Sequence, residues 1–186
     1  MIEITYASIL VAISIIWCAA RVICGVKNKT ASIKRELQLL LVYICVVVVV
    51  RFTFFPFFKV DGEFQPLVFD TARVFPFRLN LIPFVYLFDY PTLKEILINV
   101  IGNVTMFIPL GIVWPSVYKN LDTHIKVIMS GFFASLCIEI LQLPLCNQVS
   151  DVDDLILNTF GFAMGYLIYL LAKRIKKAKE DNNHGI

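Results

Sequence analysis

Charged residues are scarce in this chain: Asp, Glu, Lys and Arg make up 17% of its 186 residues. A soluble domain is typically about 25% charged and about half apolar, whereas 59% of this chain is hydrophobic. The apolar residues gather in blocks of about twenty, the length that a helix needs to cross about 30 Å of hydrocarbon. The scarcity of charge therefore argues against a soluble domain and favours a single membrane domain.

Histidine and paired cysteine are also scarce. The two histidines, His124 and His184, fall in polar connecting or terminal segments, which argues against a histidine-based zinc site or a Ser-His-Asp triad. None of the five cysteines forms a CxxC pair, and we interpret them as small packing residues. They are Cys18, Cys24, Cys45, Cys137 and Cys146. The sequence points to no particular cofactor.

Five apolar blocks predict an all-α polytopic membrane protein, a bundle of five transmembrane helices. The blocks are residues 4–26, 37–55, 96–117, 125–143 and 155–172. Basic residues follow the first block and Glu3 precedes it, an order that describes a spanning helix rather than a cleavable signal peptide. The valine run 46–50 of the second block must be helical, because only helices and closed barrels satisfy their backbone in lipid.

Three regions follow from these blocks. Residues 1–36 form an N-terminal helix and a basic loop, residues 37–172 form the main membrane domain, and residues 173–186 form a basic, polar tail that we expect to be frayed. The connection 59–94 is rich in proline and aromatic residues, which suits an outer loop at the headgroup level, with a short helix near residues 81–88. An ordinary aromatic belt is the alternative.

The basic residues predict the orientation. Placing the N-terminus outside puts twelve of the seventeen Lys and Arg residues in the cytoplasm, in the two inner loops and the tail. The outer connections then hold four, Lys59, Arg73, Arg78 and Lys94, and Arg51 lies within a helix. Positive residues favour the cytoplasmic side, so we expect a multi-pass cell-membrane protein with its C-terminus in the cytoplasm.

Polar residues of the predicted helices gather near their outer ends. They are Arg51, Asn99, Asn103, Glu139, Gln142, Asp151, Asp153, Asp154 and Asn158. Spacings of three and four place several of them on shared helical faces, including a stripe of Ser135, Glu139 and Gln142. A further stripe contains Gly161 and Gly165, a pair of small residues that lets helices approach closely. The stripes are therefore expected to meet in one recess that faces outward.

Burying these polar side chains in hydrocarbon costs free energy, whether their role is structural or functional. A charged side chain at the bilayer centre costs about 2.5–3.5 kcal/mol on insertion scales, so Glu139 should face the bundle interior or a water-filled pocket. It should pair with a cation or a hydrogen-bond donor, and Arg51, Arg73 and Arg78 are the available cations. Structural alternatives stay open: outward snorkelling for Arg51, interhelical hydrogen bonds for Asn99 and Asn103. Asp151 and Asp153 could equally form a solvated loop or cap the fifth helix.

Six short stretches of the chain resemble the VanZ-like family. In order, they are NLIPF (80–84), NVIGN (99–103), FIPLG (107–111), EILQ (139–142), DVDD (151–154) and NTFG (158–161). Each is weak by itself, but their order and spacing across residues 40–172 make the resemblance specific. It implies a multi-helix bacterial membrane protein of a family whose founding member is associated with low-level resistance to teicoplanin. Family members commonly carry an arginine shortly before the acidic run, where this chain has Gln148.

Three functions are compatible with these features. The first is a non-catalytic modulator of the cell envelope, and of glycopeptide susceptibility, that binds a lipid, a wall precursor or a lipoglycopeptide in the outer polar pocket. The candidate binding residues are Arg51, Arg78, Asn80, Asn99, Asn103, Glu139, Gln142, Asp151, Asp154 and Asn158. The expected partners are the lipid bilayer and one of these ligands, and no nucleic acid.

The second function is a membrane enzyme that acts on a lipid-linked or phosphate-bearing substrate at the outer leaflet. Glu139 or Asp154 would be the general base, and Arg51 or Arg78 would hold phosphate. Asp151, Asp153 and Asp154 are weak candidates for a Mg²⁺ or Ca²⁺ site. A transporter or flippase is the third function, disfavoured because the inner halves of the helices are almost wholly apolar.

Overall fold

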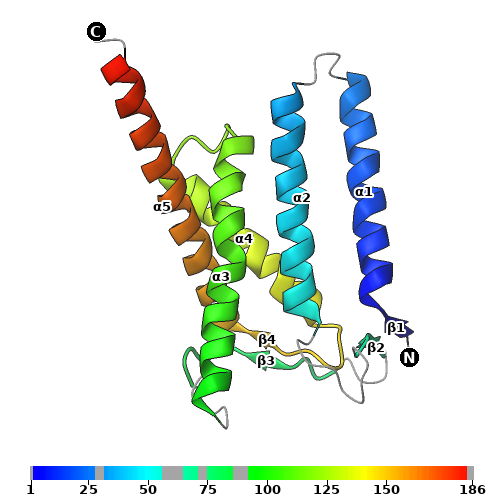
Figure 1. Ribbon diagram of the computed structural model, residues 1–186. Helices are drawn as coiled ribbons and strands as arrows, with labels where there is room; N and C mark the ends of the chain where they lie inside the picture. Colours follow the sequence, from blue (N-terminus) through cyan, green and yellow to red (C-terminus); the bar gives the residue numbers. More distant parts are fainter. Residues whose placement is uncertain (1, 28–31, 56–64, 71–74, 86–91, 184–186) are drawn as a thin grey trace.

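The computed structural model describes residues 2–27, 32–55, 65–70, 75–85 and 92–183. Within them it has five long helices, α1 (Tyr6–Lys27), α2 (Ile33–Phe54), α3 (Leu93–Val117), α4 (His124–Gln142) and α5 (Val152–Asn183). Each contains a segment long and apolar enough to cross a membrane, which confirms the five predicted helices. The odd number places the two ends of the chain at opposite ends of the bundle (Figure 1).

Four short strands lie together at the end of the bundle that also holds the N-terminus (Figure 1). They are β1 (Ile2–Ile4), β2 (Leu67–Phe69), β3 (Leu79–Asn80) and β4 (Ser150–Asp151). Strands β1 and β2 pair antiparallel, and β3 and β4 pair parallel. We call this end the strand end. The sequence did not predict these pairings, because strands of two or three residues have no detectable periodicity.

The predicted short helix near residues 81–88 is wrong for the part that the structure describes. Residues 81–85 form a turn, and residues 86–88 lie outside the described residues. Pro83 has no backbone N–H to donate, and Phe84 has a φ of 64°, in the left-handed region that a right-handed helix cannot contain. The expected position of the aromatic loop at the headgroup level stays a prediction.

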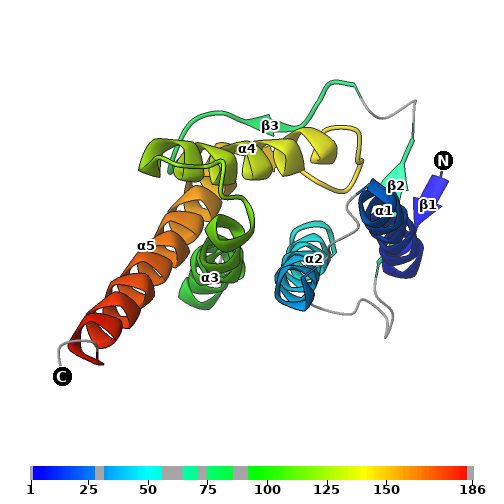
Figure 2. The ribbon, with the colours of Figure 1, turned by 90° about the horizontal axis from the view of Figure 1, so that it is seen from above.

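The helices divide into two groups by direction. Helices α1, α2 and α3 run nearly parallel, whereas α4 and α5 cross them obliquely (Figures 1 and 2). The closest packing joins α3 to α5. A Cβ atom added at Gly161 would strike the carbonyl oxygen of Val104, and one at Gly165 would strike that of Ile108. The predicted close approach at this glycine pair is confirmed, and its partner is α3.

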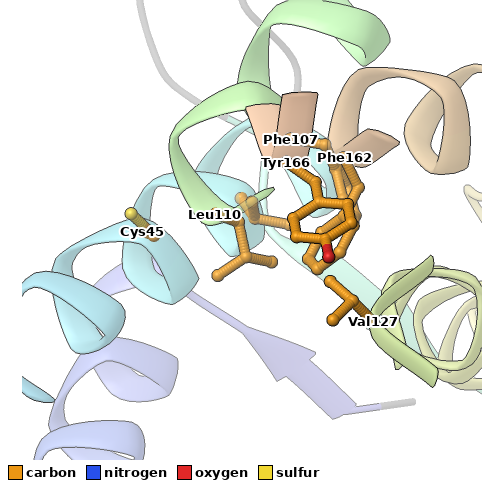
Figure 3. Close-up of a cluster of buried hydrophobic side chains, with 7 residues drawn as sticks. Cys45, Phe107, Leu110, Val127, Phe162 and Tyr166 are labelled. Carbon is orange, nitrogen blue, oxygen red and sulfur yellow. The ribbon is translucent and has the colours of Figure 1, made fainter. Parts of the chain in front are cut away.

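The main apolar core is built from four of the five helices. Cys45 and Val49 of α2 meet Phe107 and Leu110 of α3, together with Val127, Phe162 and Tyr166 from α4 and α5 (Figure 3). Helix α1 has no buried residue among those described. It is held to α2 by a hydrogen bond between the Ser14 and Tyr43 hydroxyls (2.7 Å) and by the Arg21–Glu36 ion pair.

Helices α3 and α5 extend beyond their predicted spans. Helix α3 covers the predicted residues 96–117 and begins earlier, at Leu93. It continues through Pro109 and Pro115, because in membrane helices neighbouring helices and side chains satisfy the freed backbone groups. Helix α5 continues to Asn183, so most of the basic tail is helical rather than frayed. Lys, Ala and Glu are good helix formers, and Lys176 lies 3.7 Å from Glu180 one turn later.

Candidate functional site

A cluster of buried polar side chains joins α3, α4, α5 and the β3–β4 pair at the strand end. We call it the polar cluster. Its members are Asn80, Asn103, Ser135, Glu139, Gln142, Asp151, Asp153, Asp154 and Asn158. Seven of these residues are at most 8% exposed, the exceptions being Asp151 and Asp154, which are partly buried. Polar groups buried to this extent require hydrogen-bond partners. The hydrogen bonds of the cluster therefore show which of these groups have a partner among the described residues and which do not.

Glu139 and Asp151 connect α4 to the start of α5. The backbone N–H of Asp151 donates to Glu139 Oε2 (2.8 Å), and the backbone N–H of Asp153 donates to Asp151 Oδ1 (2.8 Å). The second bond is that of a helix N-cap, since Asp151 directly precedes α5. The capping alternative for Asp151 is therefore confirmed. Asp153 is 2% exposed, which excludes the alternative of a solvated loop.

Residues 80–84 close over the acidic start of α5. Asn80 Nδ2 donates to Asp151 Oδ1 (2.9 Å), and the backbone N–H of Phe84 donates to Asp153 Oδ1 (2.9 Å). Phe84 has the left-handed φ noted above, a conformation that costs a bulky residue about 1–3 kcal/mol. The bond to Asp153 stabilises this strained turn, and the turn in turn covers the carboxylate.

Two side-chain pairs fix the deeper part of the cluster between the helices. Asn103 Nδ2 of α3 donates to Asp154 Oδ1 of α5 (2.6 Å), and Asn158 Nδ2 of α5 donates to Ser135 Oγ of α4 (3.0 Å). Asn158 and Ser135 are both fully buried. The three predicted polar stripes thus meet. Ser135 was placed on a stripe but not among the binding candidates, and its spacing of four residues from Glu139 is the signal that could have included it.

The cluster has more acceptors than donors. Four buried oxygens have no hydrogen-bond partner among the described residues: Glu139 Oε1, Gln142 Oε1, Asp153 Oδ2 and Asn158 Oδ1. Ion pairs among the described residues join Arg21 to Glu36, Lys126 to Asp122 and Lys176 to Glu180, and none of them includes a carboxylate of the cluster. The carboxyl groups of Glu139 and Asp154 lie close enough to interact electrostatically. Among the described residues, the buried acceptors of the cluster therefore outnumber the donors that reach them.

The end of α2 is fixed by two glutamines from the α4–α5 region. Gln142 Nε2 lies 3.4 Å from the carbonyl oxygen of Thr53, and Gln148 Nε2 donates to that of Phe54 (2.9 Å). These carbonyls belong to the last turn of α2, where no helical donor follows. Gln148 thus binds a helix terminus through an uncharged amide.

The predicted arginines lie apart from these contacts. The Arg51 guanidinium lies 5.6 Å from the centre of the Tyr6 ring and donates to the carbonyl oxygen of Phe55, which places it where α1 meets the end of α2. The Arg78 side chain is exposed, and its backbone carbonyl accepts from Ser150 in the β3–β4 pairing. Asn99 is half-buried on α3. Arg73 lies outside the described residues.

The weak candidates for a metal site are not arranged as one. In the part of the chain that the structure describes, no three His, Cys, Asp or Glu side chains are placed to hold a metal ion. One oxygen of Asp151 accepts from Asn80 and from Asp153, and one oxygen of Asp153 accepts from Phe84. These carboxylate oxygens accept hydrogen bonds that hold residues 80–84 and the start of α5 in place.

Comparison with protein families gives one match, to a model described as VanZ/LLP1, over residues 40–173. The chain belongs to the VanZ/LLP1 family. No curated protein and no solved structure gives a match. The match confirms the resemblance carried by the six short stretches, and membership fits a membrane protein linked to glycopeptide resistance.

The matched region of this VanZ/LLP1 protein coincides with its packed part. It contains every residue of the polar cluster and most of α2, and it leaves out α1, which has no buried residue among those described. Phe84, which contributes a backbone donor rather than a side chain, is part of the NLIPF stretch. Its role could not be found from residue type, since any residue except proline carries that N–H.

Proposed function

We propose that this VanZ/LLP1 protein modulates glycopeptide susceptibility without catalysis, by binding a membrane-borne ligand at the polar cluster. The ligand is a lipid headgroup, a wall precursor or the antibiotic itself. We further propose that the strand end faces the outside of the cell, as the distribution of basic residues predicts. All three ligands are reached from that side.

The proposal is supported by the four buried oxygens that have no donor among the described residues. An unsatisfied polar group costs about 1–3 kcal/mol when it is buried, so four of them in one cluster favour an incoming group that donates hydrogen bonds. Four carboxyl groups and no described cation in the cluster favour a cationic or neutral group over a phosphate. An ammonium group or a set of hydroxyl and amide donors fits this chemistry.

Access to the cluster requires the turn at residues 81–85 to move. Its described hydrogen bonds to the cluster come from two backbone donors: the N–H of Ile82 donates to Asn80 Oδ1 (3.2 Å), and the N–H of Phe84 donates to Asp153 Oδ1 (2.9 Å). Residues Leu81, Ile82 and Phe84 are 70%, 60% and 52% exposed, so few contacts of their side chains oppose the movement. The strained backbone conformation of Phe84 lowers the free-energy cost of moving this turn away from the cluster.

The decisive experiment replaces Glu139 by glutamine. Glu139→Gln keeps an oxygen that accepts from Asp151 and removes the charge that a donor-rich ligand would meet. Glu95→Gln is the matched control, because Glu95 is an exposed glutamate in the first turn of α3 and is not part of the cluster. Cells that express each variant are compared for teicoplanin susceptibility, and purified proteins in nanodiscs are titrated with teicoplanin, a lipid-linked wall precursor and phosphatidylethanolamine.

We expect Glu139→Gln to lose the susceptibility phenotype and to weaken binding of one ligand by about tenfold or more, as for loss of a charge-assisted hydrogen bond worth about 1.5–3 kcal/mol. Glu95→Gln should match the unmodified protein. Equal behaviour of both variants, with both folded, would refute the proposal. A change in lipid or precursor composition that depends on Glu139 would instead favour the enzyme hypothesis.

A further inference from the structure

A groove runs along the seam between α2 and α3 in the half of the bundle nearer the strand end. Its volume is about 820 Å³, in the range of about 300–1,000 Å³ found for small-molecule sites. Val48 and Phe52 form its α2 wall, and α3 forms the rest from its first turn at Leu93 to Pro109. The groove follows about four turns of α3, so it is long and narrow rather than round.

The lining of the groove is apolar except at one end. Of the eleven described residues that line it, Lys94 is the one with an ionisable side chain. The hydroxyl of Thr105 donates to the carbonyl oxygen of Ile101 in its own helix (2.6 Å), so it needs no partner from a ligand. Glu95 follows Lys94 in sequence but does not line the groove.

Lys94 marks the end of the groove that an anion would occupy. It is the second residue of α3, so its charge lies beside the positive end of the helix dipole. A cation at a helix N-terminus is unfavourable for the helix, and an anion bound beside it removes that cost. The groove therefore combines a long apolar wall with an anion-attracting end.

Gly102 leaves the floor of this groove open. A Cβ atom added there meets no atom within 4 Å, whereas one at Gly111, Gly161 or Gly165 would strike the backbone of a neighbouring helix. Glycine at those three positions is explained by helix packing inside the protein. At Gly102 no part of the described protein uses the space, so the space is available to another molecule.

We propose that the groove binds one acyl chain of an anionic phospholipid, with the headgroup phosphate at Lys94. The apolar wall matches the chain and the lysine matches the phosphate, and no carboxylate lines the groove. This site is separate from the polar cluster, which lies at Asn103 on another face of α3 and favours donors rather than an anion. Each of the two proposals can fail without the other.

Native mass spectrometry of the protein, extracted from nanodiscs that contain equal phosphatidylglycerol and phosphatidylcholine, tests this site. We expect the unmodified protein to retain one phosphatidylglycerol. Gly102→Leu fills the groove and should lower the retained fraction about tenfold. Gly25→Leu is the matched control, because a Cβ at Gly25 also meets nothing within 4 Å and Gly25 lines no described groove.

Lys94→Gln tests the headgroup separately. It should keep a bound lipid but lower the preference for phosphatidylglycerol over phosphatidylcholine about fivefold, the factor expected for one lysine beside an anionic headgroup. Thermal unfolding of each variant shows whether it is folded, and Gly102→Ala, a smaller addition, replaces Gly102→Leu if the latter is not. Any one of four results would overturn the proposal: no retained phosphatidylglycerol, retention unchanged by Gly102→Leu, an equal reduction by Gly25→Leu, or no dependence of retention on the headgroup.

Discussion

Glu139 accepts a hydrogen bond from the backbone of Asp151, twelve residues later, at 2.8 Å. The bond joins the end of α4 to the residue that caps α5, so one carboxylate fixes the angle between two helices. One oxygen of Glu139, Oε2, takes part in this bond, and the other, Oε1, has no hydrogen-bond partner in the part of the chain that the structure describes. Oε2 of Glu139 therefore has a structural role, whereas Oε1 can accept a further hydrogen bond. Different substitutions of Glu139 test these two properties separately.

Glu139→Gln should be as stable as the unmodified protein or more stable, while Glu139→Ala should be less stable by about 1–3 kcal/mol. Glutamine retains an acceptor for Asp151 and removes a group whose charged form is disfavoured by burial. Alanine leaves the Asp151 N–H buried without a partner. Thermal unfolding of the two variants in the same detergent measures the difference. A Glu139→Gln protein that unfolds as easily as Glu139→Ala would show that the charge itself stabilises the bundle.

Asn158 and Ser135 should be coupled in a double-mutant cycle. Their side chains form a 3.0 Å hydrogen bond with both residues fully buried, so each single alanine variant leaves the other residue without its partner. We expect a coupling free energy of about 0.6–1.7 kcal/mol, the range measured for hydrogen bonds between membrane helices. Unfolding of Asn158→Ala, Ser135→Ala and the double variant gives this value. Additive effects would mean that the pair is not joined in the folded protein.

The sequence predicted the helices and much of the polar cluster because both depend on short-range patterns. Apolar length identified five spans, and spacings of three and four placed Asn103, Glu139 and Asn158 on inward faces. The glycine spacing likewise predicted a close helix contact. Such patterns hold for any helix that must bury one face, so they do not depend on which helices are neighbours.

The partners within the cluster could not be predicted, because they depend on contacts between distant segments. Glu139 was expected to pair with a cation or a hydrogen-bond donor, and its described donor is the backbone N–H of Asp151, which the sequence could not single out. Backbone donors are present at nearly every residue, so no residue type signals them. The β3–β4 pairing and the left-handed conformation of Phe84 could not be predicted for the same reason. The pairing places Asn80 beside Asp151, and the turn places the Phe84 N–H against Asp153.

Gly165→Ala should weaken the bundle by about 1–3 kcal/mol. Its new methyl group would lie on the carbonyl oxygen of Ile108, so α3 and α5 must move apart. Gly102→Ala, in the partner helix, adds the same atom to open space and should leave stability unchanged or raise it by up to about 1 kcal/mol through helix propensity. Thermal unfolding compares them. Equal effects of the two substitutions would contradict the packing of α5 on α3.

Gln148→Ala should destabilise the protein by about 0.5–1.5 kcal/mol, and Gln148→Arg should not. Alanine removes the donor to the Phe54 carbonyl at the end of α2, whereas a guanidinium can donate to the same oxygen. The arginine would also restore the positive charge that family members commonly carry before the acidic run. Unfolding measurements on both variants distinguish the role of the hydrogen bond from that of the charge. If Gln148→Arg is as unstable as Gln148→Ala, the site accepts only the shorter amide.

The proposed orientation predicts which connections a membrane-impermeant maleimide reaches on intact cells. Val149, at 49% exposure beside β4, represents the strand end, and exposed Asn120 represents the opposite end of the bundle between α3 and α4. Cys45 is buried and can stay, while Cys18, Cys24, Cys137 and Cys146 are first replaced by alanine. Val149→Cys should be labelled from outside, and Asn120→Cys only after the membrane is permeabilised. The reverse pattern would place the polar cluster on the cytoplasmic side, where an extracellular antibiotic has no direct access to it, and would leave a cytoplasmic lipid or precursor as the ligand to test.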